Sequence, residues 1–341
     1  MKHLITGGCG FLGMLVSQRL LAKNEQVVIL DVWRAPDVSK DVEFIEGSIT
    51  NPEIVDRAMK GVDIVHHIAA LVPLTKAGKQ FHEVNVNGTR VVAESAARAG
   101  VSLFINTSSS TVFGKPQCPI TNQSPLMPLE DYGRSKLGGE QVLKEVADKT
   151  KMPFICVRPR TIIGQGRLGI FQILFEWIME GRNIYVMGDG TNKIQFLHAD
   201  DLINAYMLLL QLQRPGYYNV GTDRFGTLEE GLTNLIKHAG TKTKVKHLPK
   251  DLTRETLRVL DIAGLSPLAP WHYLTYSESF FFDVQPLIDL GWQPRYSNDD
   301  MFRETYDQFV ANFASFKNAR EGSAHRRRVK EKVLWVLKQL S

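Results

Sequence analysis

The stretch "TGGCGFLG", Thr6–Gly13, decides the fold. It comes directly after the strand-like run "KHLIT" (2–6) and opens a segment, 11–23, whose apolar residues recur at helical spacing. Its regularly spaced glycines are Gly7, Gly10 and Gly13. Glycines at these places allow a tight turn, the close approach of a pyrophosphate and close helix packing, while the helix N-terminus offers free N–H groups to the phosphates. The stretch therefore predicts a dinucleotide-binding loop.

Asp31 follows the next strand-like run, "QVVIL" (26–30), and stands 18 residues beyond Gly13. An acidic residue at this place binds the adenosine ribose hydroxyls and repels a 2′-phosphate. We therefore expect NAD as the cofactor rather than NADP, although Arg34, three residues further on, leaves NADP open as the alternative. A turn residue that only ends the strand is the other interpretation of Asp31.

Strand-like and helical segments alternate through the first half of the chain. Further strands are expected at 42–47, 62–68, 101–107 and 153–158, and helices at 51–60, 79–99 and 130–149. Apolar strands that alternate with helices indicate parallel strands covered on both faces. The predicted fold is therefore α/β, a doubly wound (Rossmann) parallel sheet with a smaller mixed C-terminal substrate domain.

The rhythm changes after Pro159, where helical segments and short strands follow one another less regularly. We expect residues 1–160 to form the nucleotide-binding core, with about 190–225 returning to it, and 161–315 to be mainly substrate-binding. The Pro-rich "LSPLAPW" (265–271) reads as a loop, and the acidic pair Asp200–Asp201 as a cap of the helix that follows.

Candidate catalytic residues lie in "DYGRSK" and "TSSSTVFG". Tyr132 and Lys136 are one helical turn apart and share a helix face. A tyrosine with its ordinary pKa of about 10 is a poor base, but an adjacent ammonium and an oxidised nicotinamide favour the phenolate. Ser109 follows a strand at the sheet edge where ligands bind, so its hydroxyl is placed to hold the reacting oxygen. The set predicts a hydride-transfer site.

Motifs along the chain resemble those of the extended short-chain dehydrogenase/reductases, the NAD-dependent epimerase/dehydratase family. The resemblance covers residues 2 to about 315 and rests, besides the glycine loop and Asp31, on "HHIAA" (66–70), "NVNGT" (85–89), "TSSSTVFG" (107–114), "YGRSK" (132–136), "RPRTIIG" (158–164), "FLHADD" (196–201), "YNVG" (218–221) and "LGWQP" (290–294). It implies that Ser109, Tyr132 and Lys136 are the catalytic trio. It also implies a homodimer through a four-helix interface that includes the Tyr132 helix.

The same resemblance implies cofactor contacts beyond the glycine loop. Ala69 and Ala70 would line the phosphate side, Asn85 would support the active-site helix, and Ser48 with Ile49 would border the adenine. The family more often has an acidic residue in place of Ser48. The remaining expected cofactor contacts are Phe11, Leu12, Thr107, Pro159, Tyr132 and Lys136.

Several residues are candidates to contact a substrate. Arg158 and Arg160, with Arg167 as an alternative, would suit a substrate phosphate because a guanidinium fork matches its geometry. Ser110 and Thr111 are further candidates beside Ser109.

The two histidines of "VHHIAA", His66 and His67, end a buried strand. They are expected to pack and hydrogen-bond with the backbone, or, for His67, to lie near the cofactor.

The net charge of +5 is concentrated at the C-terminal end, where 317–341 holds eight Lys or Arg against two Glu. The rest of the chain is nearly neutral, which argues against a nucleic-acid-binding surface. Residues 318–341 are expected to form a basic amphipathic helix that either contacts a membrane surface through 326–341 or docks on the protein.

Three scattered cysteines with no metal spacing fit a cytoplasmic protein, at most peripheral at the inner face of a membrane.

The reaction is narrowed by the residues that follow Ser109. Family members that dehydrate usually carry an acid there, whereas this chain has Ser110 and Thr111 and no Asp or Glu before Gly114. The first hypothesis is a nucleoside-diphosphate-sugar 4-epimerase. The second is a dehydrogenase or ketoreductase of an apolar, sterol-like or lipid-linked alcohol, which "NKIQF" (192–196) favours because many sugar-nucleotide enzymes have an arginine there. A non-catalytic NAD-binding protein is the third.

Overall fold

A computed structural model describes residues 1–75, 77–164, 167–168, 171–266, 268, 270–314 and 338. Of the predicted tail helix, 318–341, all but Lys338 lies outside the described residues.

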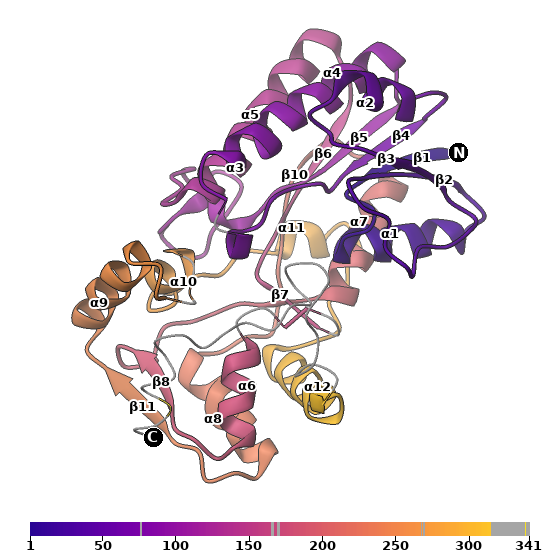
Figure 1. The fold of residues 1–341 in the computed structure, drawn as a ribbon. Helices are drawn as coiled ribbons and strands as arrows, with labels where there is room; N and C mark the ends of the chain where they lie inside the picture. The colour runs from indigo at the N-terminus through magenta and orange to yellow at the C-terminus, as the bar shows by residue number, and fades with distance from the viewer. Residues whose placement is uncertain are drawn as a thin grey trace.

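A seven-stranded parallel sheet, in the order β10-β6-β5-β4-β1-β2-β3, forms the upper half of the molecule (Figure 1). The predicted doubly wound fold is confirmed. Its strands are β1 (Lys2–Thr6), β2 (Gln26–Asp31), β3 (Glu43–Glu46), β4 (Ile64–His67), β5 (Leu103–Thr107), β6 (Phe154–Pro159) and β10 (Gly216–Val220).

Helices cover both faces of this sheet (Figure 1). One face carries α2 (Pro52–Ala58), α4 (Gly88–Ala99) and α5 (Asp131–Thr150), and the other α1 (Phe11–Leu21), α7 (Ala199–Leu212) and α11 (Gln285–Ile288). Neighbouring strand residues alternate between two apolar clusters, since Leu4 packs in one and Ile5 in the other. The strand order reverses between β1 and β4, and ligands of such sheets bind at the carboxyl ends of the strands beside that point.

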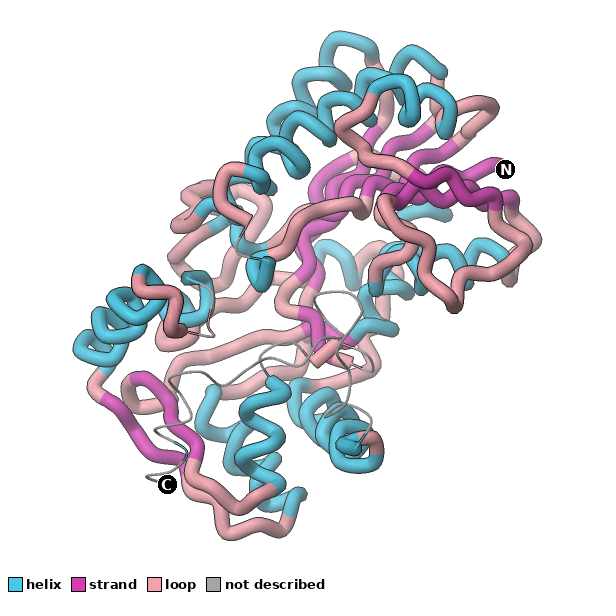
Figure 2. Tube along the Cα trace, viewed as in Figure 1, coloured by secondary structure: helices cyan, strands magenta, loops and turns pink. Residues whose placement is uncertain are grey.

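The lower half of the molecule combines helices, short strands and long connecting loops (Figure 2). It holds α6 (Phe171–Met179), β8 (Ile184–Met187), α8 (Leu228–Ala239), β11 (Val245–Leu248), α9 (Lys250–Ile262), α10 (Pro270–Thr275) and α12 (Asn298–Ala311). The two-residue strands β7 (Ile162–Ile163) and β9 (Leu197–His198) pair beneath the sheet, and α3 (Gln80–His82) lies near α5. A third apolar cluster holds this half together around Phe175, Trp177 and Phe302.

The expectation of a loop over 265–271 is wrong at its end. Proline is well suited to the first position of a helix because it has no N–H to satisfy, and α10 begins at Pro270. Trp271 is thereby buried against Phe280, with 5.4 Å between ring centroids. Helix α9 was not predicted from the sequence.

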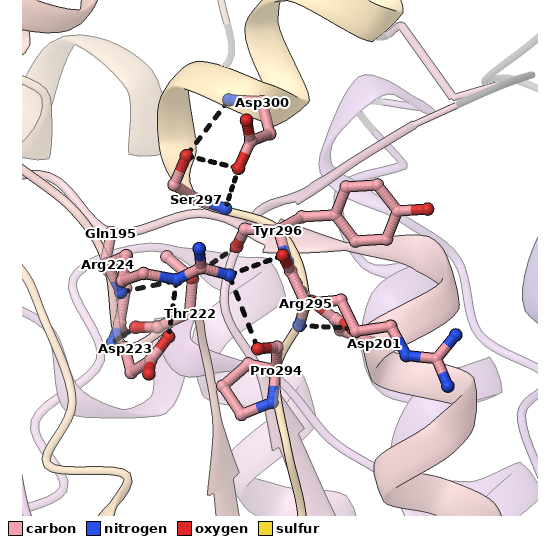
Figure 3. A network of polar contacts seen from close by, with 10 residues as sticks. All are labelled: Gln195, Asp201, Thr222, Asp223, Arg224, Pro294, Arg295, Tyr296, Ser297 and Asp300. Carbon is pink, nitrogen blue, oxygen red and sulfur yellow. Dashed lines mark hydrogen bonds and ion pairs between the residues drawn. The ribbon is translucent and has the colours of Figure 1, made fainter.

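Backbone contacts tie the segment before α12 to the sheet half (Figure 3). Both carboxylate oxygens of buried Asp201 accept the N–H of Arg295, at 2.9 and 3.0 Å, and one also accepts that of Tyr296. The predicted capping role of the Asp200–Asp201 pair is therefore wrong. The N-cap of α7 is His198, whose Nδ1 accepts the N–H of Asp200 at 3.2 Å.

None of the helices in the described parts of the chain is long and apolar enough to cross a membrane.

Candidate active site

The glycine loop connects β1 to α1 at the point where the strand order reverses. Gly7 has a left-handed φ of +69°, and a Cβ there would lie 2.7 Å from the backbone of Ala69. A Cβ on Gly13 would lie 2.3 Å from the carbonyl oxygen of Gly7. Gly10, the N-cap of α1, contributes no side-chain cap, so the first turn at Phe11 and Leu12 keeps its N–H groups for a ligand.

Asp31 ends β2 beside this loop. Its carboxylate accepts the N–H of Cys9 at 2.9 Å and that of Val32 at 2.8 Å. Burial raises the pKa of the Asp31 carboxyl, and these backbone N–H groups oppose the rise. The contact with Cys9 fixes the carboxylate against the glycine loop. Both oxygens retain acceptor capacity for ribose hydroxyls.

Two further loops carry the other predicted cofactor contacts. After β4, Ala69 lies against Gly7, with Ala70 next along the chain, so the two loops meet. After β3, the Ser48 hydroxyl bonds with that of Thr50 at 2.8 Å. Ile49 is 5% exposed and packs beneath Gly88 in the core, so its side chain is mostly used in packing.

The predicted helical segment 79–99 is confirmed, with a π-helical turn, Glu83–Asn87, inserted between α3 and α4. Asn85 lies in this turn and is 2% exposed. Its side chain bonds both the N–H and the carbonyl of Leu71, and it donates to Ser135 of α5 at 2.9 Å. The wider turn is typical of functional sites. Here it places one amide against both the loop after β4 and the predicted catalytic helix.

Ser109, Tyr132 and Lys136 meet at the carboxyl end of β5. Tyr132 and Lys136 stand on the inner face of α5, whose N-cap is Glu130. The Ser109 hydroxyl accepts the N–H of Thr111 at 3.2 Å and acts on the pKa of the Tyr132 phenol. Lys136 donates from Nζ to the carbonyl of Thr107 at 2.6 Å. The sheet edge therefore gathers a hydroxyl, a phenol and an ammonium.

The protonation of these groups is set mainly by burial. Burial raises the pKa of Tyr132 to about 12, while the nearby Ser109 hydroxyl and the Arg167 guanidinium lower it. Burial lowers the pKa of Lys136 to about 8, opposed by Cys156 and Glu140. Of the two nearby cations, Arg167 therefore acts on Tyr132 more strongly than Lys136 does, which differs from the expectation from the sequence.

The three arginines considered for substrate contact differ sharply. Arg158 is committed to the interior, because its fork binds both carboxylate oxygens of Glu140 at 2.9 and 2.6 Å. Arg160 is also buried, donating to Ser110 and to the backbone oxygen of Gln195, both at 3.0 Å. The interpretation of Arg158 as a phosphate ligand is therefore wrong.

Arg167 alone of the three stands beside both the glycine loop and the tyrosine. Its guanidinium carbon lies 5.5 Å from the centre of the Phe11 ring, and its charge acts on Tyr132. Burial lowers the pKa of this guanidinium to about 10. The neighbouring candidate Thr111 instead donates to Ser109 at 3.0 Å.

The Glu140–Arg158 pair was missed by sequence reasoning. Glu140 follows Lys136 by one more helical turn, so the spacing of Tyr132, Lys136 and Glu140 contained the signal that all three share a face. Arg158 also stacks over Phe113, in the turn that follows Ser109, at 5.2 Å. The pair thus connects α5, β6 and the serine turn.

The parallel sheet, the glycine loop and the Tyr132–Lys136 helix define a class of protein, the short-chain dehydrogenase/reductases of the extended type. A family model described as the NAD dependent epimerase/dehydratase family matches residues 3–221. The chain belongs to this family, and it is an NAD-dependent enzyme.

Relatives of several activities are similar to the chain. It is 40% identical to "Uncharacterized protein y4nG" of Sinorhizobium fredii, over 98% of this chain and 85% of that protein. It is 27% identical to UDP-arabinose 4-epimerase 1 of Arabidopsis thaliana, over 72% of this chain and 69% of that protein. Among solved structures, UDP-glucuronic acid 4-epimerase from Bacillus cereus in complex with NAD shares the fold, with a TM-score of 0.75 and 22% identity over 92% of this chain and 100% of that one.

The residues present fit NAD. The close approach at Gly7 and Gly13 leaves backbone where side chains would fill the space, and the acidic Asp31 stands where the adenosine ribose is held. Thr107 at the end of β5 has a buried hydroxyl oxygen with no partner among the described residues, which a ligand can satisfy. Pro159 ends the adjacent strand β6.

Proposed function

We propose that the chain is a nucleoside-diphosphate-sugar 4-epimerase that retains NAD and regenerates it in each cycle. The observation that carries the proposal is the position of Ser109, Tyr132 and Lys136 at the carboxyl end of β5, together with a fitting dinucleotide loop. Named relatives that are 4-epimerases of UDP-arabinose and UDP-glucose support the substrate class.

Each member of the trio has a distinct task in this proposal. NAD, when bound, supplies hydride acceptance and return. Tyr132 takes the proton from the sugar 4-hydroxyl and later gives it back, as a general base and then a general acid. Ser109 holds the same substrate oxygen and keeps the phenol oriented. Lys136 adds positive charge near Thr107, which favours the ionised tyrosine when the substrate reacts.

Arg167 is the proposed contact for the substrate diphosphate. It lies near Phe11 and Tyr132, and among the described residues its guanidinium takes part in no ion pair. A guanidinium matches phosphate oxygens geometrically. Ser110 and Thr111 remain proposed contacts near the sugar. A 4,6-dehydration is disfavoured because both hydroxyls bond within the protein and no carboxylate follows Ser109.

A dehydrogenase of an apolar alcohol is the second candidate, and Gln195 favours it. Gln195 is fully buried, with its amide donating to the carbonyl of Thr222 at 2.7 Å and accepting the N–H of Phe282 at 2.9 Å. Residue 195 is therefore committed to backbone contacts, and "NKIQF" has no arginine that could meet a diphosphate. This alternative requires NAD to exchange with solution at every turnover.

A product assay separates the two candidates. The purified protein is incubated with UDP-, GDP- and dTDP-hexoses and UDP-pentoses, and the sugar is analysed by NMR. Inversion at C4 without net formation of NADH is expected for a 4-epimerase. Stoichiometric NADH from a sterol-like alcohol, together with no change in any nucleotide sugar, would contradict the proposal.

We also propose a homodimer through α4 and α5, and a peripheral contact with a membrane through 326–341. Sedimentation measures the first, and the binding of liposomes containing anionic lipids measures the second. Deleting residues 320–341 should abolish liposome binding if the segment is an anchor. A deletion that instead yields monomers would support docking on the protein.

A further inference from the structure

A series of buried hydrogen bonds runs beneath the cofactor loop, with His67 near its middle. His67 is 2% exposed at the end of β4. Its Nδ1 lies 2.8 Å from the hydroxyl of Thr6, the last residue before the glycine loop. Its Nε2 lies 2.9 Å from the hydroxyl of Thr89 in α4. One imidazole thus bridges the first strand of the sheet and a covering helix.

The series continues to the helix that carries Tyr132. Thr89 donates its hydroxyl hydrogen to the carbonyl of Asn85 at 2.7 Å. The Asn85 side chain donates to Ser135, which in turn donates to the carbonyl of Tyr132 at 2.7 Å. Thr6 and α5 are therefore linked through three intervening residues, His67, Thr89 and Asn85.

The bonding partners fix the tautomer of His67. Because Thr89 spends its only hydrogen on Asn85, its oxygen must accept a hydrogen from the Nε2–H of His67. The Nδ1 atom is then bare and accepts the hydroxyl hydrogen of Thr6. The Thr6 oxygen in turn accepts the N–H groups of Ile68 and Ala69, at 3.3 and 3.4 Å.

A charged ring would disrupt this arrangement. An added Nδ1–H would face the Thr6 oxygen, which already accepts two N–H groups. Burial and the nearby Lys136 ammonium lower the pKa of His67 to about 3, and its ring packs against the apolar ring of Phe104. The histidine therefore stays neutral in one tautomer throughout the working range of pH.

We propose that His67 is a positioning residue that holds the glycine loop and the loop after β4 in register with the Tyr132 helix. The Thr6 hydroxyl binds the N–H of Ala69, whose backbone would lie 2.7 Å from a Cβ on Gly7. The Asn85 side chain binds the N–H of Leu71. The same bonds reach α5 through Ser135. The expected fall in turnover rests on the proposed function, whereas the expected loss of NAD retention does not.

The preceding residue provides a matched control. His66 is fully buried in the same strand and, as its neighbour in sequence, points to the opposite face of the sheet. Its ring nitrogens lie 2.9 Å from His3 and 2.9 Å from the hydroxyl of Tyr206. Replacing it removes comparable buried hydrogen bonds without touching the series through Thr6 and Thr89.

The test compares His67→Leu, His67→Gln and His66→Leu, each purified as the NAD-loaded enzyme. The loss of NAD after dilution is followed by the absorbance and mass of the released nucleotide, and unfolding by urea is measured in parallel. We expect His67→Leu to release NAD at least tenfold faster than the wild type. His67→Gln keeps one donor and one acceptor and should recover most of the retention, and His66→Leu should lose stability without faster release.

Equal NAD release by His66→Leu and His67→Leu, or no rescue by glutamine, would overturn the proposal. The kcat for a UDP-hexose should fall in the same order with a nearly unchanged KM. Absence of any turnover with nucleotide sugars, with the NAD release pattern intact, would instead reject only the proposed function.

A measurement on the wild-type protein covers the case in which a variant does not fold. Nitrogen-15 NMR of the histidine rings should show His67 with a protonated Nε2 and a bare Nδ1, unchanged between pH 8 and pH 5. A proton on Nδ1, or a charged ring at pH 6, would contradict the assignment.

Discussion

The two halves of the molecule use buried polar groups differently. In the sheet half, polar side chains gather where parallel strands end, so Asp31, Thr107 and Ser109 stand at or just beyond the carboxyl ends of β2 and β5. Toward the other half, Asp201 of α7 and Gln195 are more deeply buried, and they bind backbone groups that hold loops in place. A buried polar residue therefore indicates a site only where the topology leaves it facing a ligand.

The largest expected effect is on turnover and comes from the sheet half. Tyr132→Phe should lower kcat by about 10²–10⁴-fold, because it removes the proposed acid and base. NAD retention should be nearly unchanged, since the ring itself remains. Steady-state kinetics measure kcat, and quantification of bound NAD measures the NAD retention. Wild-type rates in this variant would show that Tyr132 is not the base.

The next largest effect compares the stability lost when a buried ion pair is broken with that lost when exposed ion pairs are broken. Arg158→Leu leaves Glu140 buried without its partner, since both side chains are 3% exposed, and should cost about 3–5 kcal/mol of stability in urea. The matched control is Glu145→Gln, which breaks the exposed pairs with Arg90 and Lys149 and should change stability by about 1 kcal/mol or less. Equal losses in the two variants would reject the assignment of Arg158 to the interior.

Cofactor choice tests the role assigned to Asp31. Asp31→Ser removes a charged acceptor worth about 1.5–3 kcal/mol and should weaken NAD binding by roughly 10- to 100-fold. With Arg34 left in place, the variant should bind NADP better than the wild type does. Calorimetry with both nucleotides measures the change. Unaltered NAD affinity would support the interpretation of Asp31 as a turn residue.

The pH dependence of stability sharpens the comparison further. His66 and His67 have pKa values lowered by burial, that of His67 to about 3, so the unfolded chain binds their protons first. Stability is complete above pH 6.5 and is lost as the pH falls toward 3, by about 1.4 kcal/mol per pH unit for each histidine. His67→Gln should lower the slope between pH 6 and pH 4 by that amount. An identical slope would mean that the ring is not held neutral.

The smallest effect belongs to the second half. Ser297 caps α12 in a reciprocal contact with Asp300 (Figure 3). Ser297→Ala should cost about 1 kcal/mol without altering NAD retention. Thermal unfolding measures the stability, and quantification of the released nucleotide measures the NAD retention. A loss of NAD in this variant would mean that the segment before α12 reaches the cofactor site.

Much of the sheet half was predictable, because alternating apolar strands and helices indicate a doubly wound parallel sheet, and the glycine spacing indicates where its ligand binds. Other features depend on residues distant in sequence. The π-helical turn at Asn85 arises from contacts with Leu71 and Ser135, and the commitment of Arg158 arises from Glu140. No local pattern contained those pairings, although the helical spacing of Glu140 from Lys136 indicated their side of α5.

The most direct test of the central claim is to denature the purified protein and quantify the released nucleotide by mass spectrometry and absorbance. The account predicts about one NAD per chain surviving purification, as a cofactor recycled within the site requires. A protein that emerges empty and binds NAD reversibly would contradict the retained cofactor and favour a dehydrogenase that exchanges NAD at every turnover.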